Sequence, residues 1–264
     1  MKKTAVDLCC DAGESFGAYT LGSDEALLSL ISSANVACGF HAGDPHVMRK
    51  TTRLAKRHGV QVGAHPSLPD LLGFGRRAMQ VSPSELQDIV TYQIGALRAL
   101  VEAEGMRLQH VLQHGALTRM AEDNEEFGRA ILGSILEVDS NLLYPAFEGS
   151  YLPEMARGMG LKVVMLAFAD RAYERNKRLV SRRHPGAVIH ELGAIEKRIE
   201  QLVIRGEVTT IDGHNVPLEF DSILLHGDTP DAVLVAQTVS NTLRRLEVVI
   251  TPMSAVYRSS TTIP

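Results

Sequence analysis

Residues 35–65, NVACGFHAGDPHVMRKTTRLAKRHGVQVGAH, contain a complete strand–helix–strand unit. A short apolar run at Asn35–Cys38 precedes a helical segment at His46–His58, and Gly59 separates that segment from a second apolar run at Gln61–Ala64. A glycine directly after a helical segment is typical of the left-handed residue that ends a helix. The stretch therefore predicts two parallel strands joined by a crossover helix.

The same alternation continues along the chain. Further short apolar runs predict strands at Ala5–Cys10, His110–Leu112, Leu142–Ala146, Lys162–Phe168 and Ser222–Leu225, with a weaker one at Ala187–Ile189. Segments of helical period predict helices at Glu25–Ser32, Ser84–Glu104, Glu122–Glu137, Tyr151–Met159, Glu191–Ile204 and Pro230–Leu246. Seven or eight strands that alternate with helices predict an α/β fold, an irregular TIM-like (β/α) barrel.

One domain accounts for residues 1–250, because no linker or shift in composition divides them. A hairpin at Gly206–Phe220, with Asp212-Gly213 as its turn, is predicted to be an insertion. Residues 251–264 are rich in Ser and Thr and lack periodicity, so we expect a loose C-terminal tail.

Charge and composition exclude several classes of protein. The chain has 264 residues and a formal net charge of −4, without a basic block, so neither a nucleic acid nor a membrane is an expected partner. The three cysteines, Cys9, Cys10 and Cys38, are odd in number and are expected to be core thiols of a protein in a reducing compartment. With no signal peptide or membrane span expected, the predicted location is the cytoplasm.

Four histidines stand at the C-terminal ends of predicted strands, each followed by a small or turn residue: His41, His65, His114 and His226. In a parallel barrel these strand ends open on one face, where the loops build the active site. Imidazole is both a metal ligand and a proton carrier near neutral pH. A single histidine of this kind is more often a hydrogen-bonded core residue, but four in matching positions favour a shared site.

Two of these histidines begin a similar pattern, His41-Ala-Gly-Asp44-Pro and His226-Gly-Asp228-Thr-Pro. Asp44 is expected to cap the following helix, with proline at the first helical position. The same geometry points free backbone N–H groups at the strand ends, which suits a carboxylate or a phosphate. Asp44 and Asp228 are therefore candidate substrate-binding residues as well.

The first predicted strand ends in carboxylates, at Asp11 and Glu14. A strand period of two places Asp7, Cys9 and Asp11 on one side. A buried aspartate is unfavourable unless it is paired or used. Asp11 and Glu14 are candidates for general base and acid, and Asp11 with His65 and His114 is a candidate site for a divalent metal. For Glu14 a loop salt bridge is the alternative.

Two loops offer groups for an anionic small-molecule substrate. Gly73-Phe-Gly-Arg76-Arg77 presents two guanidinium groups on a glycine-rich loop, and Asp170-Arg171 with Tyr173 follows another strand end. Arginine suits bidentate recognition of carboxylates, although surface solvation is the alternative for each. No Walker A, dinucleotide-binding or nucleophile-elbow motif occurs.

With these residues in place, the sequence resembles the LamB/YcsF family from Asp7 to about Leu246. The matching blocks are Asp11-x-Gly-Glu-Ser-Phe-Gly17, Ser33-Ala-Asn-Val-Ala-Cys-Gly-Phe-His-Ala-Gly-Asp-Pro45, Gly63-Ala-His-Pro-Ser67, Gly73-Phe-Gly-Arg-Arg77, His114-Gly-Ala-Leu117, Phe168-Ala-Asp-Arg-Ala-Tyr173, Pro185-Gly-Ala-Val-Ile-His190 and His226-Gly-Asp-Thr-Pro230. The resemblance implies an irregular barrel similar to that of metal-dependent polysaccharide deacetylases. It also implies one component, called A, of an ATP-dependent 5-oxoprolinase, which opens 5-oxoproline to glutamate together with the B and C components.

If the resemblance carries over, Asp11, helped by a strand-end histidine, acts as general base or metal ligand, and Arg76 or Arg77 holds the substrate carboxylate. The sequence departs from the family pattern in four places: Cys9 replaces Asn, Leu112-Gln113 replaces Lys-Pro, Thr118-Arg119 replaces Tyr-Asn, and Leu166 replaces Glu. Two alternatives therefore stay open. One is a metal-dependent deacetylase of glycans, and the other is a relative that has lost catalysis and serves as a binding or regulatory subunit.

Overall fold

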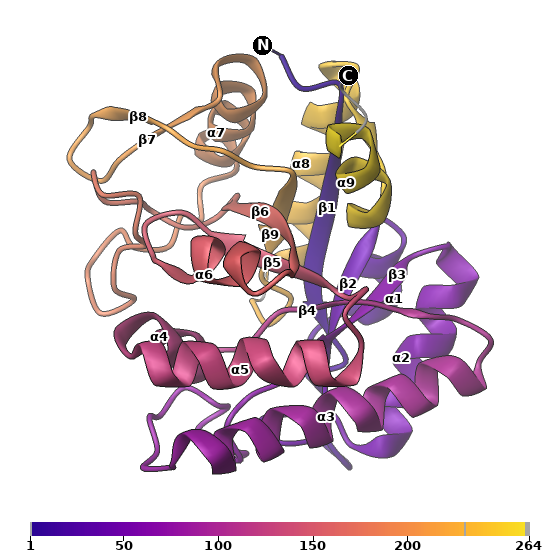
Figure 1. Ribbon diagram of the computed structural model, residues 1–264. Coiled ribbons are helices and arrows are strands. Elements are labelled where there is room, and N and C mark those ends of the chain that lie inside the picture. Colours follow the sequence, from indigo (N-terminus) through magenta and orange to yellow (C-terminus); the bar gives the residue numbers. More distant parts are fainter. Residues whose placement is uncertain (1, 230, 262–264) are drawn as a thin grey trace.

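The computed structural model describes residues 2–229 and 231–261. Within this part of the chain, parallel strands form a closed barrel (Figure 1). In order around the barrel, its strands are β1 (Ala5–Ala12), β2 (Ser33–Ala37), β3 (Gln61–His65), β4 (Leu108–Val111), β5 (Leu143–Phe147), β6 (Lys162–Phe168) and β9 (Ser222–Leu225). The pairing of β1 with β9 closes the ring, with Cys10 opposite Leu225. The predicted (β/α) barrel is confirmed.

Three short strands lie outside the ring. β10 (Val249–Ile250) extends the sheet beside β1, while β7 (Glu207–Thr209) and β8 (Asn215–Pro217) form the predicted antiparallel hairpin. The weak strand predicted at Ala187–Ile189 is wrong, because Val188 makes only an isolated bridge with Arg171 in a long loop.

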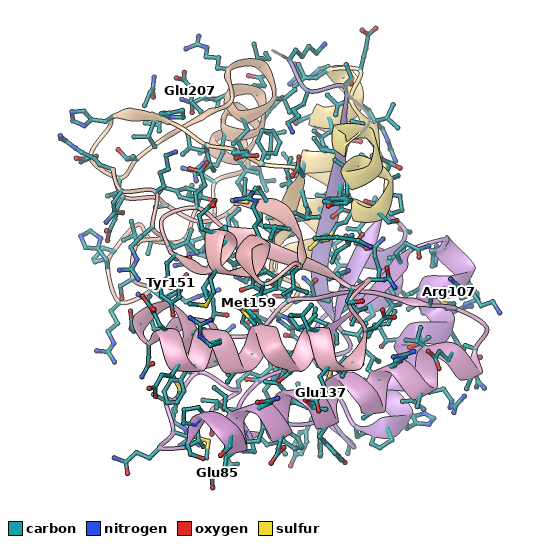
Figure 2. The ribbon with its side chains drawn as sticks, viewed as in Figure 1. Glu85, Arg107, Glu137, Tyr151, Met159 and Glu207 are labelled. Atoms are coloured by element: carbon teal, nitrogen blue, oxygen red, sulfur yellow. The ribbon has the colours of Figure 1, made fainter. Side chains whose placement is uncertain are left out.

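Helices connect the strands and cover the barrel. They are α1 (Asp24–Leu28), α2 (Pro45–His58), α3 (Pro83–Ala103), α4 (Ala116–Asp123), α5 (Glu125–Val138), α6 (Leu152–Gly158), α7 (Leu192–Arg205) and α8 (Ala232–Arg245). Figure 1 shows α3 and α5 side by side, a pairing that their contacts support. The α3 N-terminus has the full capping box of Ser82 and Glu85, and Glu85 marks this end of α3 in Figure 2.

The single helix predicted at Glu122–Glu137 is two helices, α4 and α5. Asn124 separates them, because its extended backbone ends α4 while its side chain accepts a hydrogen bond from the Glu126 N–H and caps α5. Gly59 ends α2 at φ 71°, as the sequence predicts. The helix predicted at Pro230–Leu246 begins at Ala232 in α8, and Pro230 itself lies outside the described residues.

The prediction of a loose tail over 251–264 is wrong for most of its length. Met253–Thr261 forms α9, which lies beside β1 near the start of the chain (Figure 1). Met253 is fully buried and Val256 nearly so, so apolar side chains hold this helix against the barrel despite its Ser- and Thr-rich sequence. Residues 262–264 lie outside the described part.

Other expectations from composition hold for the described residues. Cys9, Cys10 and Cys38 are free and buried, as predicted for core thiols. None of the described helices combines the length and the apolar character needed to cross a membrane.

A buried carboxylate lies near the N-terminal end of β1. Asp7 is fully buried, and its two oxygens accept hydrogen bonds from the hydroxyls of Ser32 (2.7 Å), Ser33 (2.6 Å) and Ser222 (2.5 Å). Burial raises the pKa of Asp7 to about 6, although the serine hydroxyls oppose that shift. Asp7 thus ties β1 to β9 and to the segment that begins β2.

The raised pKa of Asp7 predicts a pH-dependent stability. The unfolded chain ionises Asp7 near pH 4 and the folded chain near pH 6, so this group's contribution is complete below pH 4 and is lost as the pH rises to 6. We expect the free energy of unfolding, measured in urea, to fall by about 2 kcal/mol between pH 4 and pH 7 relative to that of Asp7→Asn. A difference between the two proteins that does not change with pH would contradict this.

Candidate active site

Three of the four strand-end histidines meet at the C-terminal mouth of the barrel. His41 follows β2, His65 ends β3 and His114 follows β4, and all three are buried. The His41 and His114 rings stack with centroids 4.1 Å apart, and the His65 ring meets that of His114 edge-on at 4.9 Å. The buried Glu14 joins them, since its Oε1 lies 3.9 Å from His41 Nε2. These four residues are called the histidine cluster below.

Backbone carbonyl groups fix the tautomers of two cluster histidines. His65 Nδ1 lies 2.6 Å from the Leu112 carbonyl oxygen, and His114 Nε2 lies 2.9 Å from that of Phe74. A carbonyl oxygen only accepts, so these two nitrogens carry the protons. In the neutral rings the lone pairs are then on His65 Nε2 and His114 Nδ1, which face each other at 3.0 Å. Two opposed lone pairs at this distance repel each other, and a cation bound by both nitrogens, or a proton shared between them, removes that repulsion.

The remaining cluster groups are also poised to bind a cation. Within the part of the chain that the structure describes, neither ring nitrogen of the buried His41 has a hydrogen-bond partner, and such unpaired groups are rare inside proteins. Burial lowers the pKa of His41 and of His114 well below the usual value, which keeps both imidazoles neutral. Ligand atoms of all four cluster residues lie within 4.8 Å of one another. The donor set of three imidazoles and a carboxylate fits a divalent metal such as Zn²⁺.

The loop at residues 73–77 covers the cluster. The Phe74 ring meets those of His41 and His114 edge-on, at centroid distances of 5.4 and 5.2 Å. Gly75 has φ +63°, and a Cβ there would lie 2.1 Å from Ser67 Oγ and 2.9 Å from His41 Cβ. Only glycine therefore lets the loop lie this close to the histidines. The sequence pointed to this loop for its arginines, and the covering role of Phe74 was missed.

Asp11 lies beside the cluster and not within it. Its Oδ1 lies 3.4 Å from His65 Nε2 and accepts a hydrogen bond of 2.8 Å from Asn35 Nδ2. Asp11 thus lies next to His65, whereas the group of possible metal ligands consists of Glu14, His41, His65 and His114 and does not include Asp11. Burial and the charges of Asp11 and Asp228 raise the pKa of Glu14 well above its usual value.

His226 forms a separate pair at the same mouth. It directly follows β9, and a Cβ on the next residue, Gly227, would lie 2.1 Å from the carbonyl oxygen of Asp11. His226 Nδ1 lies 2.7 Å from Asp170 Oδ2, and the His226 ring stacks on Phe168 with centroids 5.2 Å apart. Asp170 thereby orients an imidazole near Asp11, an arrangement common in acid–base catalysis.

Arg76 and Arg77, both predicted to bind the substrate, lie in different surroundings. Arg76 lies over the Phe74 ring and pairs with Asp228 at 2.5 Å, so both stand at the rim of the site. Arg77 points away, because it is ion-paired with Asp70 and its side chain is 65% exposed. Arg76 and Asp228 thus lie at the mouth of the barrel, and Arg77 lies away from it.

Three other candidates have structural partners. Asp44 caps α2 by accepting from His46 and Val47 N–H groups, as predicted, and it also accepts from the Gly17 N–H. Arg171 donates to the carbonyl oxygens of Val180 and Ala187, and the buried Tyr173 hydroxyl accepts from the Phe168 N–H. Arg171 and Tyr173 therefore fix the loop that follows β6.

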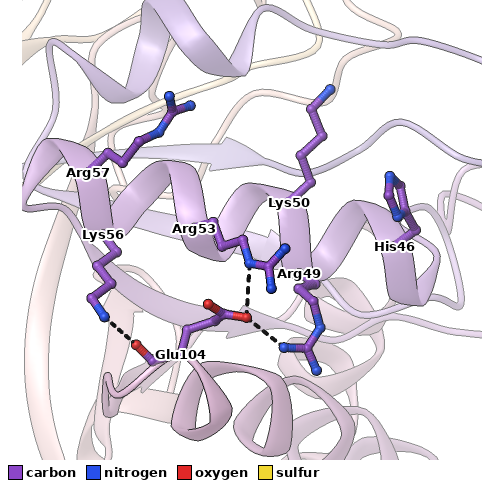
Figure 3. Close-up of a pocket in the computed structure, with 7 residues that line it drawn as sticks. All are labelled: His46, Arg49, Lys50, Arg53, Lys56, Arg57 and Glu104. Carbon is purple, nitrogen blue, oxygen red and sulfur yellow. Dashed lines mark hydrogen bonds and ion pairs between the residues drawn. The ribbon is translucent and has the colours of Figure 1, made fainter.

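A hollow on the outer face of α2 is lined by basic residues: His46, Arg49, Lys50, Arg53, Lys56 and Arg57 (Figure 3). The Glu104 carboxylate accepts from Arg49 at 2.6 Å and from Arg53 at 3.0 Å. Lys56 donates to the Glu104 carbonyl oxygen. One carboxylate is thus shared by two arginines, so the lining keeps an excess of positive charge, and none of the cluster residues lines this hollow.

The structure is thus a parallel (β/α) barrel with a histidine- and carboxylate-lined site at the C-terminal ends of its strands. Residues 6–258 match the model of the LamB/YcsF family, and the chain belongs to that family.

Named relatives and a solved structure match nearly the whole chain. It is 49% identical to the A subunit of 5-oxoprolinase from Pyrococcus furiosus over 94% of this chain and 97% of the relative. It is 47% identical to the protein of the same name from Bordetella pertussis, over 91% and 96% of the two chains. The crystal structure of a lactam utilization protein from Thermus thermophilus matches with a TM-score of 0.90 and 44% identity, covering 94% of this chain and 99% of that one.

The geometry of the cluster predicts metal binding. After dialysis against Zn²⁺ or Co²⁺ and removal of free metal, we expect about one ion per chain, and we expect stripping with a chelator to lower the melting temperature. His65→Ala and His114→Ala should retain far less metal, measured by elemental analysis. His226→Ala is the matched control, because His226 lies at the same mouth outside the cluster. Equal metal contents in all four proteins would contradict the assignment.

Proposed function

We propose that this chain is the A component of an ATP-dependent 5-oxoprolinase and opens the lactam ring of 5-oxoproline to glutamate. The observation that carries the proposal is the identity of 47–49% to relatives of that name over nearly their full lengths. The proposal includes the B and C subunits as partners, a cytoplasmic location, and coupling to ATP. ATP supplies the driving force for cleaving a resonance-stabilised amide.

The residues at the mouth fit the reaction that such a component must perform. Amide hydrolysis needs an attacking water that loses a proton and a leaving nitrogen that gains one. In the proposed mechanism Asp11 accepts the proton from the water. His226, oriented by Asp170, donates a proton to the ring nitrogen as the C–N bond breaks. Arg76, at the exposed rim, binds the substrate carboxylate.

Glu14, His41, His65 and His114 would hold a divalent metal, which would polarise the lactam carbonyl as a Lewis acid. Phe74 covers His41 and His114, and all three cluster histidines are buried. Low dielectric around the reacting carbonyl strengthens each charge interaction there. The bound substrate therefore lies between the metal side of the mouth and the His226–Asp170 pair.

The test is glutamate release from 5-oxoproline by the purified chain mixed with candidate B and C subunits. We expect release only with ATP present. Asp11→Asn should lower kcat by about 10²- to 10⁴-fold, the usual contribution of a general base. Arg77→Ala is the matched control, because Arg77 lies outside the site, and it should leave the rate unchanged. An intact complex without ATP-dependent glutamate would refute the proposal. Acetate release from an acetylated glycan by the same sample would support the deacetylase alternative instead.

The alternative of a relative without catalysis rests on Cys9, Leu112 and Leu166, all of them buried. The contacts at two of these positions favour an intact site. Cys9 Sγ accepts a hydrogen bond from Asn35 Nδ2, so the side chain at position 9 still provides an acceptor for this amide. Leu112 contributes its backbone carbonyl oxygen to His65, which any residue at this position can do.

Leu112→Lys distinguishes the two alternatives. Leu112 is 2% exposed, so an unpaired ammonium there should destabilise the fold by about 3–5 kcal/mol and should not raise glutamate release. Leu112→Met is the matched control of similar volume. If Leu112→Lys combined with Cys9→Asn gave glutamate where the unsubstituted chain gave none, the chain would be the impaired relative.

A further inference from the structure

A chain of buried polar side chains runs under the site, and the proposed mechanism uses none of them. His110 on β4 and Asn35 on β2 are both completely buried. His110 Nε2 lies 2.7 Å from Asn35 Oδ1, and His110 Nδ1 lies 3.0 Å from Gln109 Oε1. The sequence places His110 in a predicted strand without indicating a role for it.

Gly63 makes this arrangement possible. It lies opposite Asn35 in the β2–β3 register, between the strands that carry the two polar residues. A Cβ at Gly63 would lie 2.1 Å from His110 Nε2 and 2.2 Å from its Cδ2. The imidazole therefore crosses over a backbone that has no side chain, and it reaches Asn35 directly.

The protonation state of His110 follows from its partners. Burial lowers the pKa of His110 to about 3, so the ring is neutral near pH 7. Asn35 donates its Nδ2 to the Asp11 carboxylate, so its oxygen faces His110; Nε2 of His110 therefore carries the proton and Nδ1 accepts. A flip of the Gln109 amide, which exchanges oxygen and nitrogen, gives Nδ1 a donor. His110 is then a fixed donor to Asn35.

Asp11 and His110 together hold the Asn35 amide in a single orientation. With Oδ1 bound to His110, Nδ2 faces Asp11 Oδ1 at 2.8 Å and Cys9 Sγ at 3.2 Å. Among residues 2–229 and 231–261, the contacts of the Asp11 carboxylate with Asn35 and His65 are both made by Oδ1. One oxygen of the carboxylate is thus held, and the other is left to accept a proton.

We propose that Asn35 and His110 are positioning residues, which hold the Asp11 carboxylate so that its Oδ2 faces the attacking water. This inference rests on the proposed function for the role of Asp11, while the hydrogen-bond network itself does not. Neither residue touches the substrate. Both act through Asp11, and Gly63 provides the room that they need.

The experiment compares His110→Leu with His110→Gln in the assembled enzyme. Leucine fills a similar volume without a donor, whereas the glutamine amide can place an N–H near the position of Nε2. We expect kcat to fall about 10- to 100-fold in His110→Leu with KM little changed, because a small misplacement of a catalytic group has effects of this size. His110→Gln should recover most of the loss. Metal content should stay constant, since His110 lies outside the cluster.

Two controls separate positioning from a general loss of stability. Ser134→Ala removes a buried hydroxyl on α5, outside the network, and should leave kcat unchanged. Imidazole ¹⁵N resonances of the unsubstituted chain should show His110 neutral and protonated at Nε2 from pH 5 to pH 8. A proton on Nδ1, or equal kcat losses in the leucine and glutamine variants at equal stability, would overturn the inference. If the unsubstituted enzyme releases no glutamate, the proposed function fails. The ¹⁵N resonances of His110 then test the hydrogen-bond network by themselves.

Discussion

The pairing of β1 with β9 is the constraint on which the site depends. It joins the first strand of the barrel to the last one, so Asp11 and His226 become neighbours although 215 residues separate them in the sequence. The same closure forces the ends of β2, β3 and β4 to share one mouth with them. Without it, the histidine cluster and the His226–Asp170 pair would belong to different edges of an open sheet.

Closure also creates an interior that the sequence fills with polar groups. Asp7 and its three serines lie near the N-terminal ends of the strands, and Gln109, His110 and Asn35 lie between them and Asp11. Buried polar groups are stable only when they are paired. Part of the interior of this barrel is therefore a hydrogen-bonded support for the site. Cys9 and Leu112, which depart from the family pattern, still accept hydrogen bonds from Asn35 and His65.

The cluster shows how backbone groups prepare side chains for a ligand. Carbonyl oxygens of Leu112 and Phe74 set the tautomers of His65 and His114, so the lone pairs point inward before any cation arrives. Such preorganisation reduces the free energy needed to assemble a metal site. The cover provided by Phe74 depends in turn on Gly75, where no other side chain fits.

The sequence by itself determined the alternation of strands and helices that predicts the barrel, and the histidines at the strand ends, because hydrophobic period, capping residues and helix-ending glycines are local signals. It did not determine which side chains meet. Arg77 and Arg171 looked equivalent to Arg76, yet Asp70 and two loop carbonyl groups bind them elsewhere, and α9 forms from a Ser- and Thr-rich segment because the barrel buries Met253. Only the tertiary structure placed Glu14 with the histidines and His110 over Gly63, since those contacts join residues far apart in the chain.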